Sequence, residues 1–143
     1  MAEENPRPDN VDGLEAWLEE RPEDNRALLK LAALYAREGR VHLAVDAYGR
    51  AGDLLCRDGL ILRALDAYER ALGLDRHRPR LMVKLAAANL AVGFRDKAVR
   101  SLKRAAEAAL KVGDSALLIE ALDHLCGLDA EAAARWIQAN SAT

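Results

Sequence analysis

The stretch REGRVHLAVDAYGRAGDLLCRDGLILRALDAYERAL, residues 37–72, decides the fold because it presents one pattern of small and aromatic residues twice. The pattern begins with glycine and continues with alanine, tyrosine and alanine at fixed spacings. It occupies Gly39, Ala44, Tyr48 and Ala51, and again Gly59, Ala64, Tyr68 and Ala71. The offset of 20 residues is the length of one helix and one turn, which predicts a series of similar helices that pack side by side.

A longer duplication contains this short one. Residues 25–78 align with residues 79–132 at an offset of 54 without a gap, and both copies contain the motifs KLAA and GLD. Aligned pairs include Gly39 with Gly93, Gly59 with Gly113, and Ala44 with Ala98. We therefore predict one domain, in which two three-helix units lie between an N-terminal tail and capping helix, residues 1–24, and a C-terminal capping helix and tail, residues 130–143.

Apolar residues within each unit recur at the spacing of an amphipathic helix, as at Leu28, Leu31 and Tyr35. Glycines stand where one periodic segment ends and the next begins, which is typical of helix termini that need a positive φ. The predicted helices cover residues 11–20, 25–38, 41–57, 60–73, 80–92, 95–112, 115–126 and 130–140. Trp17 and Trp136 lie in the two outer helices, where we expect them to pack as part of the caps.

The order of these residues resembles the consensus of the tetratricopeptide repeat family. In the first unit the matching residues are Leu28, Leu31, Ala32, Tyr35, Gly39, Ala44, Tyr48 and Ala51. In the second unit they are Met82, Leu85, Ala86, Asn89, Gly93, Ala98, Leu102 and Ala105, with asparagine in place of the expected aromatic residue. The resemblance covers most of residues 25–128 and implies an all-α, right-handed α-solenoid of about eight antiparallel helices with a cap at each end.

The spacing of the glycines departs from that of the family. Gly59 and Gly93 are 34 residues apart, the length of a standard repeat, but Gly39 and Gly59 are only 20 apart. We therefore predict that the helix over residues 41–57 is shared, as the second helix of one motif and the first helix of the next. This compressed spacing is similar to that of short repeat modules in bacteria, so a bacterial protein is expected.

The composition limits the classes of partner. Hydrophobic residues make up 51% of the 143 residues but aromatic residues only 4%, so the core must consist mainly of Ala, Leu and Val. A net charge of −2 indicates a surface of mixed sign, and the arginine-rich loop over residues 75–80 lacks aromatic residues for base stacking, so nucleic acid is not the expected partner. No apolar run is long enough for a membrane span or a signal peptide, which favours a cytoplasmic protein without membrane insertion.

The sequence contains no recognisable catalytic or cofactor-binding motif. His42, His77 and His124 lie in different predicted elements, and none has a nucleophile or carboxylate at a familiar catalytic spacing. Cys56 and Cys126 lack the further ligands of a zinc site, and we expect both to be buried as small apolar residues. A protein without enzymatic activity, metal or cofactor is therefore expected.

Candidate partner-binding residues lie on the helix faces that the apolar stripes leave free. They are Arg26, Lys30, Arg37, Arg80, Lys84, Arg100, Arg104 and Lys111. Charges on these faces alternate in sign in the first unit, whereas basic residues predominate in the second, which predicts a basic groove for an acidic segment. The alternative is that these charges form a solvated helix face without a partner. The resemblance places this groove on the first helix of each unit, where Leu29, Ala33, Val83, Ala87 and Leu90 would also contribute.

A second set of residues is assigned a structural role, namely Gly39, Ala44, Tyr48, Gly59, Ala64, Tyr68, Gly93, Ala98 and Gly113. Within this set the two tyrosines are expected to fill the space between successive helices. These observations favour a non-enzymatic adaptor, a monomer or weak dimer, that binds a peptide or surface of another protein. The alternative is a structural self-assembly module that associates with a second copy. An accessory subunit that positions an enzyme without contributing to catalysis also fits.

Overall fold

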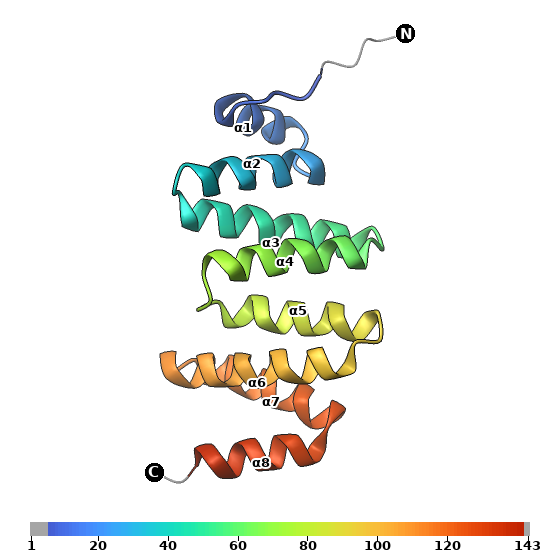
Figure 1. Ribbon diagram of the computed structural model, residues 1–143, viewed down its shortest axis with the longest axis vertical. Coiled ribbons are helices and arrows are strands. Elements are labelled where there is room, and N and C mark those ends of the chain that lie inside the picture. The colour runs from blue at the N-terminus through green and yellow to red at the C-terminus, as the bar shows by residue number, and fades with distance from the viewer. Residues whose placement is uncertain (1–5, 142–143) are drawn as a thin grey trace. The chain divides into compact units, whose positions relative to one another are not determined.

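The computed structural model describes residues 6–141, which form eight α-helices and no β-strand (Figure 1). The helices are α1 (Val11–Glu20), α2 (Asn25–Arg37), α3 (Val41–Arg57), α4 (Ile61–Leu74), α5 (Pro79–Ala91), α6 (Arg95–Val112), α7 (Ser115–Leu128) and α8 (Ala130–Asn140). The prediction of an all-α fold is confirmed, and every helix begins and ends within two residues of its predicted position. The first five residues of the predicted N-terminal tail and the last two of the C-terminal tail lie outside the described range.

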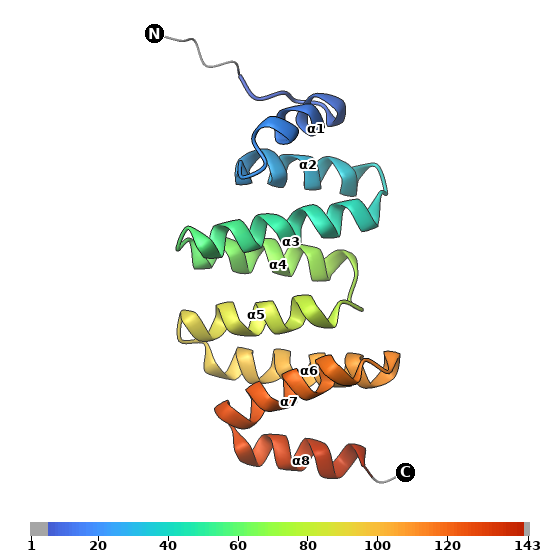
Figure 2. The ribbon, with the colours of Figure 1, turned by 180° about the vertical axis from the view of Figure 1, so that it is seen from behind.

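The chain divides into two compact units, Met1–Asp75 and Arg76–Thr143, and each is described by itself. In the first unit α2 packs between α1 and α3, and α3 packs against α4. In the second unit α6 packs against α5 and α7, α7 packs against α8, and α5 also contacts α7. The chain reverses direction after α2, α3, α5 and α6 (Figure 2). The helix α3 contacts both α2 and α4, as a helix shared by two motifs must.

Four of these helices end in the same glycine turn. The residues concerned are Gly39, Gly59, Gly93 and Gly113, whose φ values are 76°, 78°, 86° and 73°. The residue after each glycine donates its backbone N–H to the carbonyl five residues earlier, as Arg40 does to Tyr35 at 2.9 Å and Phe94 to Asn89 at 2.8 Å. This hydrogen bond satisfies a carbonyl at the helix end. A residue with a Cβ in the same left-handed conformation would lower the free energy of unfolding by about 1 kcal/mol.

The core of each unit is built from fully buried alanines and from larger buried residues. Ala44, Ala64 and Ala98 have no exposed surface, while Tyr48 and Tyr68 are only 5% and 2% exposed. Burial of a large side chain of this kind contributes about 2 to 3 kcal/mol. Both tyrosines therefore lie in the core and are not available to a partner.

The ring of Tyr68 lies directly against the backbone of α3 at Gly52. A Cβ atom at this glycine would lie 2.4 Å from Cε1 of the tyrosine, far inside van der Waals contact. The tyrosine hydroxyl donates to Oδ1 of Asp53 at 2.6 Å, and burial together with this bond raises the pKa of Tyr68. The aligned residues in the second unit are Ala106 and Leu122, so a larger residue stands at the position of the glycine and a smaller one at the position of the tyrosine.

The carboxylate of Asp24 joins the N-terminal segment to α1 and α2. It accepts hydrogen bonds from the backbone N–H of Ala27 at 3.2 Å, from Nε1 of Trp17 at 2.9 Å and from Nε of Arg7 at 2.6 Å. Burial opposes ionisation of Asp24, but these hydrogen bonds outweigh it and hold the pKa of this carboxyl below its ordinary value. In α8 the other tryptophan, Trp136, is 9% exposed. Both tryptophans therefore pack within the terminal helices, as predicted.

The prediction that both cysteines are buried is wrong. Cys126 is exposed, and Cys56 is only partly buried, with its sulfur 3.8 Å from the hydroxyl of Tyr68. In α7 the buried stripe consists of Leu117 and Leu125, with an alanine between them. The cysteine follows the last of these leucines and is therefore rotated about 100° around the helix, which carries it out of the stripe.

Candidate functional site

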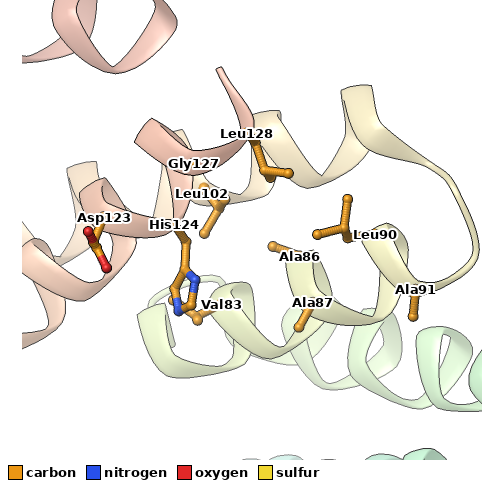
Figure 3. A pocket seen from close by; sticks show the side chains of 10 residues that line it. All are labelled: Val83, Ala86, Ala87, Leu90, Ala91, Leu102, Asp123, His124, Gly127 and Leu128. Atoms are coloured by element: carbon orange, nitrogen blue, oxygen red, sulfur yellow. The ribbon is translucent and has the colours of Figure 1, made fainter. Parts of the chain in front are cut away.

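The second unit contains a groove between α5 and α7 (Figure 3). Its volume is about 560 Å³, which lies within the range of roughly 300 to 1,000 Å³ found for ligand-binding pockets. The lining residues are Val83, Ala86, Ala87, Leu90, Ala91, Leu102, Asp123, His124, Gly127 and Leu128. All but two of these residues are apolar or glycine, so the groove is suited to apolar side chains.

Small residues keep the groove open. Ala87 and Ala91 line it from the exposed side of α5, and Gly127 lines it from α7, where nothing lies within 4 Å of the position that a Cβ would take. Leu102 of α6 is buried beside them, at 2% exposure, whereas Leu90 is 44% exposed. An apolar side chain that entered the groove would therefore contact apolar surface on three helices, and each Å² removed from water contributes about 25 cal/mol.

The polar side chains of the lining are Asp123 and His124, and both are exposed. Nε2 of His124 lies 4.0 Å from Oε1 of Glu120, one turn earlier on α7. No Ser, Thr, Cys, Lys or Tyr side chain lines this groove. Across residues 6–141, no group of three or more His, Cys, Asp or Glu side chains is arranged to hold a metal ion. The groove therefore offers a binding surface with polar groups at its edge.

A basic depression of about 290 Å³ lies at the N-terminal ends of α5 and α7. It is lined by Arg78, Pro79, Arg80, Leu81, Lys84, Asp114 and Leu117. Arg80 and Lys84 share the exposed face of α5 with Ala87 and Ala91, because residues three and four apart are neighbours on a helix surface. A segment that placed apolar side chains in the groove would therefore have two basic side chains within reach along the same helix.

The eight predicted partner-binding residues are all exposed, and they lie on three helices. Those on α2 are Arg26, Lys30 and Arg37, those on α5 are Arg80 and Lys84, and those on α6 are Arg100, Arg104 and Lys111. In the first unit Lys30 forms an ion pair with Asp9. In the second unit Arg80 and Lys84 are brought together in the basic depression.

The three basic residues of α6 lie on another face. Leu102 faces the groove, and Arg100 and Arg104 stand two residues before and after it, which rotates each of them by about 200° around the helix. Neither arginine lines the groove or the basic depression, and the same is true of Lys111. The predicted partner-binding residues of the second unit therefore lie on two separate surfaces, whereas the charge pattern of the sequence predicted one groove.

Larger side chains occupy two of the central aligned positions of the first unit, although Ala36 there aligns with the larger Leu90. There Tyr48 takes the place of Leu102, and Arg70 takes the place of His124. Nε of Arg70 pairs with Oδ2 of Asp66 at 2.9 Å, and this hydrogen bond, with a smaller interaction with Tyr48, raises the pKa of the arginine. The second copy has thus exchanged a tyrosine and an arginine for smaller residues at the position of the groove.

Part of the groove was identified from the sequence and part was missed. Val83, Ala87 and Leu90, which the resemblance places on the first helix of the second unit, do line it. The sequence did not predict that residues of α7 line the groove, because the resemblance places the groove on the first helix of each unit alone. A comparison of the two copies could have indicated α7, because the long side chain of Arg70 in the first copy aligns with the shorter side chain of His124 in the second.

No helix within the described residues is long and apolar enough to cross a membrane. No protein-family model matches the sequence, and no curated protein matches it.

Comparison with solved structures finds similar arrangements of helices. MamA from Desulfovibrio magneticus RS-1, residues 41 to the end, is similar with a TM-score of 0.51 and 16% identity, over 90% of this chain and 80% of that chain. A double mutant of MamA RS-1 named ArsTM gives a TM-score of 0.52 and 16% identity, over 90% and 79%. TTC0263, a TPR protein of Thermus thermophilus, is similar over 90% of this chain and 88% of that chain at 21% identity, but its TM-score of 0.36 is too low to add to the argument.

At a sequence identity of 16%, the similarity to the MamA structures supports a conclusion about the fold alone. The MamA structures, the helix pairs with their repeated glycine turns and the matching consensus residues agree on one architecture. The chain therefore has a tetratricopeptide-like helical-repeat fold.

Proposed function

We propose that this chain is a non-enzymatic protein-interaction module that binds a segment of a partner protein in the groove between α5 and α7. The observation that supports this proposal most directly is the open apolar groove beside a basic depression on the same helix face. The segment that fits best carries apolar side chains for the groove and acidic side chains for Arg80 and Lys84. A preformed groove of this kind favours binding because little ordering is needed when the partner docks.

The two parts of the site would contribute differently to binding. Burial of apolar side chains against Leu90, Leu102 and Val83 would supply most of the affinity, because the hydrophobic effect scales with the area removed from water. The exposed Arg80 and Lys84 would mainly accelerate association with an acidic segment, and this contribution should weaken as salt screens the charges.

Selection of peptides from a display library tests the proposal even though the partner is unidentified. Peptides would be selected on the wild-type protein and counter-selected on Ala87→Arg, in which a long charged side chain enters the groove. We expect the selected peptides to combine apolar residues at helical or alternating spacing with acidic residues on one side. Their affinity, measured by titration calorimetry, should fall at least about tenfold for Ala87→Arg, because loss of about 1.4 kcal/mol is a factor of ten.

The duplication supplies the matched control. Ala33 is exposed on α2 at the position that aligns with Ala87, so Ala33→Arg adds the same side chain to the same helix face of the first unit. This variant should bind the selected peptides as the wild type does. Peptides that bind all three proteins equally, or a library from which nothing is enriched, would contradict the assignment of the groove.

A further inference from the structure

The two compact units carry opposite net charges. Met1–Asp75 contains 16 acidic and 10 basic residues, whereas Arg76–Thr143 contains 7 acidic and 11 basic residues. The small net charge of the whole chain, −2, therefore conceals a strongly uneven distribution. Surfaces of opposite sign attract each other during diffusional encounter, so two copies of such a chain are drawn together with unlike units facing.

The positive charge of the second unit is concentrated on α6, on the face that does not contribute to the groove. Arg104 and Lys111 are seven residues apart, so they lie on one line along the helix about 10.5 Å apart, and Arg100 lies one turn before them. These three residues, here the basic stripe, are exposed, and none of them forms an ion pair with another described residue. Glu107 is the acidic residue on this face, and the stripe outnumbers it three to one.

The two copies differ in charge at one position of the basic stripe and in the pairing of another. Arg100 aligns with Asp46 of the first unit, which reverses the charge at this position. Lys111 aligns with Arg57, but in the first unit that arginine forms an ion pair, with Nη1 2.8 Å from Oε1 of Glu23. The first copy thus balances its charges internally, whereas the second copy presents an uncompensated basic surface.

A complementary acidic surface lies on α1. Asp12 and Glu19, here the acidic stripe, are exposed and are also seven residues apart, which gives them the same separation of about 10.5 Å along the helix axis. The opposite face of α1 buries Leu14 and Leu18, so the acidic stripe faces away from the core of its own unit. Ala16 lies between the two acidic residues on the exposed side and allows a second helix to approach closely.

From this match of charge and spacing we infer that the acidic stripe of one copy docks against the basic stripe of a second copy. With the two helices side by side, Asp12 and Glu19 each face one member of the pair Arg104 and Lys111. The two contact surfaces differ, so one such contact leaves an acidic stripe on one copy and a basic stripe on the other, through which the assembly can close or add a further copy. The contact uses neither wall of the groove, which stays open for the partner segment proposed above.

Sedimentation velocity of the full chain over a range of concentrations tests this inference. At about 20 mM salt, where screening is weak, the weight-average mass should rise with concentration above the monomer value of 15.6 kDa. At about 1 M salt, where the Debye length is about 3 Å, the mass should return to that of the monomer. A protein that stays monomeric at low salt and at the highest concentration would overturn the inference.

A charge exchange identifies the two surfaces. The variants Arg104→Glu/Lys111→Glu and Asp12→Lys/Glu19→Lys should each remain monomeric alone, because each then presents two stripes of the same sign. An equimolar mixture of the two variants should associate again, because every contact in it joins unlike charges. A mixture that stays monomeric, or variants that self-associate as the wild type does, would contradict the pairing.

Two controls separate this contact from other effects. Arg50→Glu/Arg63→Glu changes the net charge by the same amount at exposed sites of the first unit, away from both stripes, and should leave self-association unchanged. Ala87→Arg, which blocks the groove, should also leave it unchanged, so that failure of one proposal can be distinguished from failure of the other. Circular dichroism and thermal unfolding establish that every variant is folded.

Discussion

The contact between Gly52 and Tyr68 provides a direct test of how the two copies fill their cores. A methyl group at Gly52 would lie 2.4, 2.7 and 2.9 Å from three atoms of the tyrosine ring. The ring cannot easily move away, because it is buried and its hydroxyl is bonded to Asp53 at 2.6 Å. We therefore expect Gly52→Ala to destabilise the protein, although alanine favours helix more than glycine does.

The expected magnitude follows from three contributions. Replacement of glycine by alanine in a helix interior contributes about 1 kcal/mol in favour of folding. The extra methyl group in a packed core costs about 1 to 3 kcal/mol, and displacement of the Tyr68 hydroxyl from Asp53 costs about 1 kcal/mol more. The free energy of unfolding should therefore fall by about 1 to 3 kcal/mol. Tyr68→Leu alone should lower it by about 2 kcal/mol, because a cavity opens against the glycine.

The double variant Gly52→Ala/Tyr68→Leu introduces the residues that the second unit has at the aligned positions, Ala106 and Leu122. Its loss of stability should be smaller than the sum of the two single losses by about 1 to 2 kcal/mol, because the new methyl group fills part of the cavity. Urea unfolding followed by far-UV circular dichroism measures all four proteins of the cycle.

Gly73→Ala is the control for helix propensity. This glycine lies in α4, and nothing lies within 4 Å of the position of its Cβ, so alanine should raise the free energy of unfolding by up to about 1 kcal/mol. If Gly52→Ala were as stable as the wild type, or if the losses in the double variant were additive, the packing argument would be refuted.

Two further predictions concern residues of the first unit. Tyr48→Ala should lower the free energy of unfolding by about 3 to 5 kcal/mol, because a large buried side chain is removed, and unchanged thermal stability would show that the ring does not support the core. Asp24→Ala should cost about 1 to 2 kcal/mol at pH 7, because α2 loses its cap. The pKa of Asp24 is lowered in the folded state, so its stabilising effect is present above about pH 4 and is lost as the pH falls through the lower folded value. The difference between variant and wild type in urea unfolding should therefore shrink from about pH 5 to about pH 2, and a constant difference would contradict this account.

Only part of the candidate site could be predicted from the sequence. The sequence predicted that Arg80 and Lys84 are exposed on the same helix face as Ala87, because this prediction needs only the period of one helix. It did not show that α7 forms the other wall of the groove, because α5 and α7 are separated by the whole of α6 and meet only in the folded unit. It also grouped Arg100 and Arg104 with the residues of α5, although they lie on a different face of the second unit.

The sequence by itself determined the positions of the helices and of the turns between them. Apolar periodicity and glycines such as Gly39 and Gly93 report the local conformation of the backbone, which depends on residues within a few positions along the chain. Tertiary structure alone decided that Gly52 must lack a Cβ and that the second copy has an open groove. Both features depend on the volumes of side chains that meet from different helices, as Tyr68 does with Gly52, and no period in the sequence records which side chains meet.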